Sequence, residues 1–164
     1  MDNLQTTPYF RMRVYRATFD TNVFVRAVLG RDNVANALIS LWLDEAFILV
    51  LPQTIIAEVQ DVLSRRNLIR KHRYAPETVA NLINLLKQDA TLVEVPFSFR
   101  LCRDADDDAL VDCAIHERAQ FLVSYDNDLL DDTELKQSLF EHGIEIVEPL
   151  VFLEKIREAE INES

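Results

Sequence analysis

Apolar residues gather in short runs along the chain, and five of these runs predict β-strands. Each run is rich in β-branched, aromatic or other apolar residues and is bounded by proline or by polar, turn-forming residues. The run FILVL is uninterrupted, which is typical of a strand that is covered on both faces. The predicted strands are residues 14–19, 47–51, 91–95, 120–124 and 144–147.

Between these strands, apolar residues recur every three or four positions, which predicts helices with one buried face. Asp32, Thr54 and Pro76 are residue types suited to a helix start. Strands that alternate with helices predict an α/β fold, a three-layer α/β/α sandwich around a central, mainly parallel sheet. The predicted helices run from about 33 to 45, from 54 to 63, from 76 to 86, from the acidic run at 104–108 to 114, from 133 to 143, and from 149 onward.

The composition fits one globular domain without linkers or repeats. The chain has 164 residues, 49% of them hydrophobic, and only two glycines and five prolines. No apolar run approaches the roughly 20 residues of a membrane span. The first eight residues lack the basic and apolar parts of a signal peptide, so we expect a cytoplasmic protein with no membrane contact. Cys102 and Cys113 have no metal-ligand spacing.

Acidic residues stand at the ends of predicted strands and at the starts of predicted helices. Asp20 and Asp126 follow two of the strands, and Glu58 and Asp108 lie in the first turns of two helices. The carboxyl ends of parallel strands share one edge of the sheet, so we expect these four carboxylates to converge there. Converging carboxylates repel one another and favour a bound cation, and oxygen ligands suit Mg²⁺ or Mn²⁺. The pattern predicts a metal-dependent nuclease.

Each acid also has a simple structural interpretation. The strand-end aspartates can be turn residues, and Glu58 can be a solvated residue of an amphipathic helix. The acids at 104–108 can cap a helix and favour the positive end of its dipole. Periodicity allows either Asp107 or Asp108 to face the site, because consecutive residues of a helix are rotated by about 100°. The joint placement of the acids favours the functional interpretation.

The same acidic segments resemble the motifs of PIN-domain ribonucleases. No single segment is specific, but their order along the chain is. The similarity covers roughly residues 13–157, nearly the whole chain. The segments that carry it are FDTNVF at 19–24, the stretch 52–63 that contains Glu58, DADDDAL at 104–110, FLVSYDNDLL at 121–130 and IEIVEP at 144–149.

The resemblance implies a PIN-like nuclease domain at residues 13–157, preceded by an N-terminal extension at 1–12 and followed by a tail at 158–164. It implies a site for Mg²⁺ or Mn²⁺ and cleavage of single-stranded or loop RNA. It favours Asp108 over Asp107, because the segment DALV that begins at Asp108 looks like the family's third motif. The implied metal ligands and catalytic residues are Asp20, Glu58, Asp108 and Asp126, with Asn22, Asp107, Ser124 and Asp128 in auxiliary roles.

The VapC-like bacterial branch of this family implies further properties. Its members are toxins that a small antitoxin protein holds in check, and they are often homodimers. This chain departs from the family in its extension at 1–12 and in Tyr125, which occupies a turn position where the family often has glycine. A PIN-like module that binds RNA or protein without catalysis is the alternative, and the presence of all four acids favours catalysis.

The formal charge of −11 is unusual for a protein that binds RNA, because such proteins carry a basic surface. The densest basic stretch follows the helix of Glu58. Most such runs are solvated helix faces and loops, and a contact with RNA is the functional interpretation of this one. Its residues are Arg65, Arg66, Arg70, Lys71 and Arg73.

Two other classes of α/β protein with acids at strand ends fit less well. A phospho-accepting signalling domain needs a lysine from a late strand, and no lysine occurs between Lys87 and Lys136. A haloacid-dehalogenase-like phosphatase needs a second aspartate two positions after its nucleophile, where this chain has Asn22. The nuclease interpretation therefore accounts best for the acidic pattern.

Overall fold

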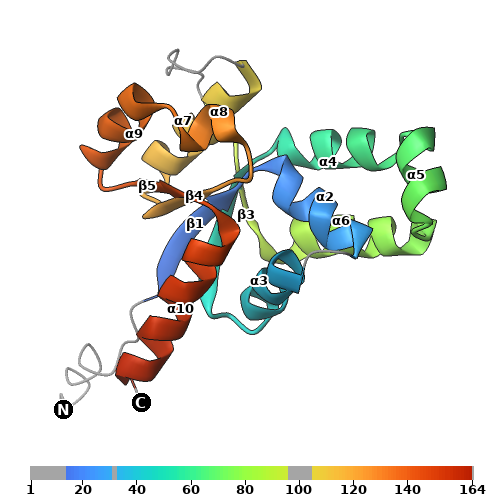
Figure 1. Cartoon of the computed structure of the whole chain (residues 1–164), viewed down its shortest axis with the longest axis horizontal. Helices are drawn as coiled ribbons and strands as arrows, with labels where there is room; N and C mark the ends of the chain where they lie inside the picture. Colours follow the sequence, from blue (N-terminus) through green and yellow to red (C-terminus); the bar gives the residue numbers. More distant parts are fainter. Residues whose placement is uncertain (1–13, 31–32, 96–104, 164) are drawn as a thin grey trace.

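Five parallel strands form the central sheet of the computed structural model, which describes residues 14–30, 33–95 and 105–163 (Figure 1). The order across the sheet is β3-β2-β1-β4-β5, and every neighbouring pair is parallel. The strands are β1 (Tyr15–Phe19), β2 (Phe47–Pro52), β3 (Thr91–Val93), β4 (Phe121–Val123) and β5 (Glu145–Val147).

Helices cover both faces of this sheet, so the expected three-layer α/β/α sandwich is confirmed. One helical layer consists of α2 (Thr21–Leu29), α3 (Asn33–Leu43), α4 (Ile55–Leu63), α6 (Pro76–Asp89) and α10 (Pro149–Glu163). The other consists of α7 (Ala105–His116), α8 (Asn127–Leu130) and α9 (Thr133–Phe140). The short helix α5 (Arg66–His72) buries no residue and projects beside the end of α4 (Figure 1).

Alternate residues of the central strands enter two separate hydrophobic cores. Leu49 and Leu51 of β2 belong to the core beneath α2, α3 and α10, whereas Val50 between them belongs to the core beneath α7. Leu122 of β4 likewise faces the α7 side. Because Leu49, Val50 and Leu51 are all buried, β2 is apolar on both of its faces here. This explains the uninterrupted run FILVL.

The sequence pattern does not predict α2, α5 or α8. Helix α2 begins directly after β1 because the Asp20 carboxylate caps it by accepting a hydrogen bond from the Thr21 N–H. It ends at Gly30, whose φ of 73° lies in the left-handed region that favours glycine. The expected caps at Asp32 and Asp104, and the expected extension at 1–12, lie outside the described residues.

The order of the strands reverses between β1 and β4. The chain places β2 and β3 on one side of β1 and then returns to place β4 and β5 on the other side. Crossovers that leave in opposite directions open a crevice at the carboxyl ends of the two central strands. Asp20 follows β1 and Asp126 follows β4, so the topology brings these two acids to the crevice.

Candidate functional site

A pocket of about 360 Å³ lies where Asp20 and Asp126 leave the sheet. Its walls come from the segments after β1 and β4, from α4 and from the start of α7. Five of its residues are carboxylates and one is an arginine, so its surface is strongly acidic. The lining residues are Asp20, Thr21, Asn22, Val25, Glu58, Asp61, Val62, Arg65, Asp107 and Asp126.

Asp20 is held by hydrogen bonds to both carboxylate oxygens. Its Oδ1 accepts from the Thr21 N–H at 2.7 Å, and its Oδ2 accepts from the Ser124 hydroxyl at 2.7 Å. The Asn22 amide nitrogen lies 3.4 Å from the same Oδ2. Its position at the start of α2 also stabilises the carboxylate, because the positive end of the helix dipole favours a negative charge. These contacts leave Asp20 one preferred orientation at the pocket.

Ser124 and Asn22 connect the two central strands below the pocket. Ser124 is buried. Its hydroxyl oxygen accepts a hydrogen bond from the Asp126 N–H at 2.9 Å, and the same hydroxyl donates a hydrogen bond to Asp20 Oδ2. The Asn22 Oδ1 accepts from the Tyr125 N–H at 3.2 Å. The segment that carries Asp126 is therefore tied to the segment that carries Asp20.

Glu58 lies in the first turn of α4 and reaches the pocket from the opposite wall. Its Oε2 accepts from the Thr21 hydroxyl at 2.8 Å. Thr21 is a site residue that the sequence interpretation treated only as part of a turn. Asp61 follows Glu58 by one helical turn and lines the same pocket, which the three-residue spacing on α4 predicts in hindsight.

The acidic run contributes Asp107 to the pocket, and Asp108 is not among the lining residues. Both side chains are buried, with 8% and 6% of their surface exposed. The first turns of α7 pack against the sheet, so neighbouring positions on this helix meet different surroundings although both are covered. Of the acids singled out as ligands or auxiliary residues, Asp20, Glu58, Asp107 and Asp126 line this pocket, whereas Asp108, which the sequence resemblance favoured, does not.

Asp126 caps the short helix α8 at the pocket. Its Oδ1 accepts from the Asp128 N–H at 2.9 Å. Asp128 itself is exposed and does not line the pocket. A capping carboxylate keeps lone pairs for further partners, because an ionised aspartate has about four acceptor sites.

Comparison with known proteins identifies the domain that carries these residues. Residues 16–128 match the family described as the PIN domain, which is about two thirds of the 164-residue chain. The chain belongs to the PIN domain family. The match spans every acid that lines the pocket. The family resemblance of the acidic segments is therefore confirmed.

Individual relatives of this PIN domain are distant. An uncharacterized protein of Methanocaldococcus jannaschii is 22% identical over 116 residues, 70% of this chain and 73% of that protein. The structure of VapBC2 from Rickettsia felis, bound to a DNA fragment from their promoter, aligns with a TM-score of 0.51 and 14% identity over 81% of this chain and 98% of that chain. FitAcB from Neisseria gonorrhoeae aligns with a TM-score of 0.45 and 15% identity, covering 82% and 98% of the two chains. At 14% identity the likeness to the VapBC2 structure shows the fold alone.

The donor set of the PIN-domain pocket suits a hard divalent cation. Every candidate ligand is an oxygen of a carboxylate, hydroxyl or amide group, and Mg²⁺ and Mn²⁺ prefer oxygen ligands. No three acidic, histidine or cysteine side chains in the described part of the chain stand close enough to hold an ion as they are placed. The oxygen donors of these residues are of the kind that a divalent ion prefers. Their side chains must move closer together to bind it.

Arg65 is the arginine of the pocket lining and pairs with Asp61 at 3.3 Å. Both side chains are exposed, so the ion pair contributes little to stability. The predicted basic stretch continues along α5, where the other four cationic side chains are all exposed to solvent. They are Arg66, Arg70, Lys71 and Arg73.

Cys113 lies in the interior of the PIN domain, on α7, and is fully buried. Burial raises the pKa of its thiol to about 12. A thiol with this pKa is protonated at neutral pH, and burial keeps it away from solvent, so the environment of Cys113 is that of a packing residue. Cys102 lies outside the described residues. Among the described helices, none has the length and apolar character needed to cross a membrane.

Proposed function

We propose that this PIN domain is a Mg²⁺- or Mn²⁺-dependent endoribonuclease that hydrolyses phosphodiester bonds in RNA. The observation that carries the proposal is the meeting of five carboxylates, from four separate segments, in one pocket at the point where the strand order reverses. Acids that serve only as helix caps or turn residues have no reason to face a common cavity. Open parallel sheets bind their ligands at this point of the fold.

The ligand set that we propose is Asp20, Glu58, Asp107 and Asp126. Asp107 takes the place of Asp108 because it lines the pocket with the other three acids. Asp61 stands on the same wall as Glu58 and adds to the negative charge that attracts a cation.

The protein side chains position and orient the reacting groups. Ser124 and Thr21 hold the carboxylates of Asp20 and Glu58 by short hydrogen bonds, which orient these two proposed ligands. When bound, the divalent ion polarises a phosphoryl oxygen and assists deprotonation of the attacking water. Arg65, at the edge of the pocket, offers its guanidinium to an RNA phosphate. Without a cation, the acidic pocket repels the phosphate backbone.

The basic stretch on α5 extends this contact away from the pocket. Its five cations occupy nine positions of a chain whose formal charge is −11. Phosphate contacts of this kind supply affinity without sequence preference and weaken as the salt concentration rises. We therefore place the RNA backbone across the pocket and along α5.

The VapC-like resemblance extends the proposal to biological context. We infer a toxin that a small antitoxin protein inhibits, acting as a homodimer in the cytoplasm. The structural neighbour from Rickettsia felis is named VapBC2, and it is bound to a DNA fragment from their promoter. Inspection of the reading frame beside this one tests the inference, because a small upstream frame that encodes a DNA-binding protein with a polar tail is expected.

Cleavage of RNA by purified protein tests the chemistry. Activity should require Mg²⁺ or Mn²⁺ and disappear in a chelator. Asp20→Asn, Glu58→Gln, Asp107→Asn and Asp126→Asn should each lower the rate at least a hundredfold while circular dichroism stays unchanged. Asp89→Asn, which removes an exposed carboxylate at the end of α6, is the matched control. Cleavage by the four variants at the control's rate refutes the proposed site.

Calorimetric titration with Mn²⁺ separates the two candidates on α7. Asp107→Asn should weaken Mn²⁺ binding more than Asp108→Asn, because only Asp107 lines the pocket. Asp108→Asn alters a buried carboxylate and is expected to lower stability instead. A larger loss of Mn²⁺ affinity for Asp108→Asn restores the assignment that the sequence resemblance favoured.

A PIN domain that binds RNA without cleaving it is the second candidate. One observation favours it: no three acids in the described residues stand at metal-binding distance as they are placed. The same titration decides between the two. Binding of Mn²⁺ in the micromolar range supports the nuclease. Binding of RNA, without cleavage and without a heat of Mn²⁺ binding in the titration, supports the binding module.

A further inference from the structure

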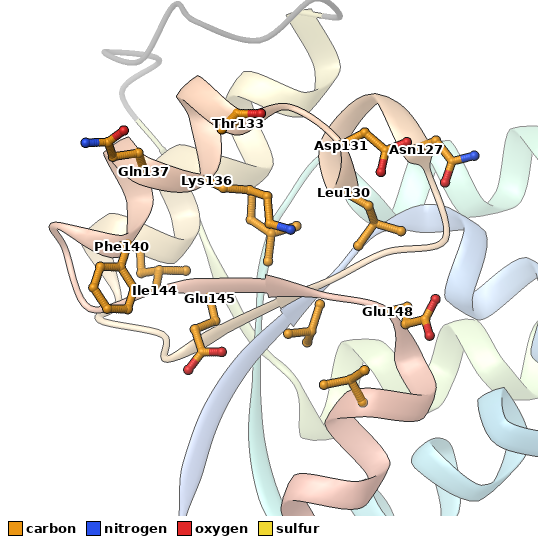
Figure 2. Close-up of a pocket in the computed structure, with 13 residues that line it drawn as sticks. Asn127, Leu130, Asp131, Thr133, Lys136, Gln137, Phe140, Ile144, Glu145 and Glu148 are labelled. Atoms are coloured by element: carbon orange, nitrogen blue, oxygen red, sulfur yellow. The ribbon is translucent and has the colours of Figure 1, made fainter.

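A second, larger pocket of about 950 Å³ lies along the outer edge of β5 (Figure 2). Helices α8 and α9 form one wall, and Glu148, which precedes α10, and Val151 of α10 form the other. The residues of β5 form the floor between them. This edge groove shares no lining residue with the acidic pocket of the proposed nuclease site.

The floor of the edge groove presents backbone hydrogen-bonding groups. β5 is the last strand of the sheet, and among the described residues no strand lies beyond it. The Glu145 N–H and the Val147 carbonyl are bonded to the β4 side, at 2.9 and 3.1 Å. Ile146 lies between them, so its N–H and carbonyl point away from β4 toward the groove. An unpaired strand edge is a template for another strand.

Apolar side chains flank this open backbone. Phe140 of α9 is 70% exposed, which is unusual for a phenylalanine, and it stands beside the strand (Figure 2). Leu130 of α8 and Val151 of α10 are half-buried on the two walls. An extended chain directs successive side chains to opposite faces. A strand added to β5 would therefore place alternate side chains against the α8–α9 wall and the α10 wall.

The charges of the groove select the kind of strand. Three lining carboxylates, Asp131, Glu145 and Glu148, are exposed to solvent, against one cation, Lys136. The net charge of the lining is therefore −2, from one positive and three negative groups. A strand that carries lysine or arginine complements it, whereas the RNA backbone is repelled.

The same charges argue against a second copy of this chain as the occupant. A symmetric pairing of two β5 edges about Ile146 brings the acids of both copies into one interface. Like charges on opposed strands destabilise the pairing. A basic partner has no such cost.

We propose that the open edge of β5 binds an extended, basic and apolar segment of a partner protein, which adds to the sheet as a sixth strand. Main-chain hydrogen bonds to Ile146 supply affinity. Apolar side chains against Phe140 and Leu130, and cations against the acids of the groove, supply selectivity. The site is independent of the nuclease pocket, so either proposal can fail alone.

Short labelled peptides test the proposal by fluorescence anisotropy with the full chain. The probe is acetyl-Lys-Ile-Lys-Val-Lys-amide, and acetyl-Glu-Ile-Glu-Val-Glu-amide is the charge-reversed control. Two further probes have the sequence of the basic probe and carry methyl groups on backbone nitrogens. In one probe the isoleucine and valine are methylated, and in the other the three lysines are. Only one of these sets of N–H groups faces β5, so one methylated probe should lose binding and the other should retain it.

Protein variants locate the binding site. The double variant Glu145→Gln, Glu148→Gln removes two charges of the groove and should lower the affinity for the basic probe about three- to tenfold. Glu154→Gln with Glu158→Gln removes two exposed charges of α10 outside the groove and is the matched control. Phe140→Ala should weaken binding by a similar factor without affecting the fold, because the ring is largely exposed. The Ile146 amide should gain protection from hydrogen exchange when the probe is bound.

Each contrary outcome identifies another explanation and overturns the proposal. Equal binding of both methylated probes, or equal weakening by the two double variants, means nonspecific attraction to an acidic protein. Absence of binding together with a concentration-dependent dimer that Phe140→Ala dissociates means that a second copy covers the edge. Displacement of the probe by single-stranded RNA, with protection of Ile146 by the RNA, means that the groove belongs to the RNA path.

Discussion

The buried hydroxyl of Ser124 connects two of the proposed metal ligands, and Ser124→Ala tests how much this connection contributes. The hydroxyl donates to the Asp20 carboxylate at 2.7 Å and accepts from the Asp126 N–H at 2.9 Å. Ser124 is 0% exposed, so water cannot replace the lost oxygen without entering the protein. The substitution is a small one, because alanine lacks only the hydroxyl group.

The expected loss of stability follows from the two hydrogen bonds. A hydrogen bond to a charged group contributes about 1.5–3 kcal/mol, and a buried donor left without a partner costs about 1–3 kcal/mol. Asp20 and Asp126 are half-buried and partly rehydrate, so we take the lower part of the sum, about 2.5–4 kcal/mol. For a domain of this size the melting temperature should fall by about 5–15 °C.

Urea unfolding in the presence of a chelator measures this loss without a contribution from bound ions. Ser64→Ala is the control, because the Ser64 hydroxyl donates to the Asp61 carbonyl at an exposed position and should contribute less than about 0.5 kcal/mol. In a second measurement, Mn²⁺ affinity of Ser124→Ala should fall about 10- to 100-fold, as expected when a partner of a metal ligand is removed. If Ser124→Ala unfolds at the same urea concentration as the control and binds Mn²⁺ with the parent's affinity, the hydrogen bonds of Ser124 do not organise the site.

Two further predictions use other parts of the site and the core. Thr21→Val keeps the shape of the side chain and removes only the hydroxyl that holds Glu58. The rate of RNA cleavage should fall about tenfold or more with little change in circular dichroism. An unchanged rate contradicts the positioning role of Thr21. The pKa of the Cys113 thiol is raised to about 12, above its value of about 8.5 in an unfolded chain, so the folded state retains the proton between these values. The free energy of unfolding should then decrease as the pH rises above about 8.5, by up to about 1.4 kcal/mol per unit more than in Cys113→Ala, and parallel pH profiles of parent and variant would show that the thiol does not contribute.

Local sequence patterns predicted the strands because their signal is confined to a few neighbouring residues. The predicted strands at 47–51 and 120–124 became β2 and β4, whose residues enter the cores on both faces of the sheet. Alternation of strands with helices was sufficient to predict a parallel sheet. From that, the meeting of acids at the carboxyl ends of the strands followed as a geometric consequence.

Helix α2 was missed because its local preference contradicts its structure. The segment TNVFVRAVL contains three valines, and β-branched residues favour strands. Its helical form is set by Asp20 at the start and Gly30 at the end, and by the burial of Val23 and Phe24 in the core. Tertiary packing therefore overrides local propensity here, and it does so at the position that carries Thr21 into the pocket.

The sequence by itself determined which residue types are available at the site and on which side of the sheet they emerge, because both depend on position relative to strand ends. Only the tertiary structure shows that Asp107 lines the pocket and Asp108 does not, since a rotation of about 100° on a helix is resolved by packing against the sheet and not by periodicity. Only the tertiary structure joined Asp20 to Ser124, which are 104 positions apart in the chain. Their hydrogen bond exists because β4 returns to the side of β1, a pairing that no local pattern encodes.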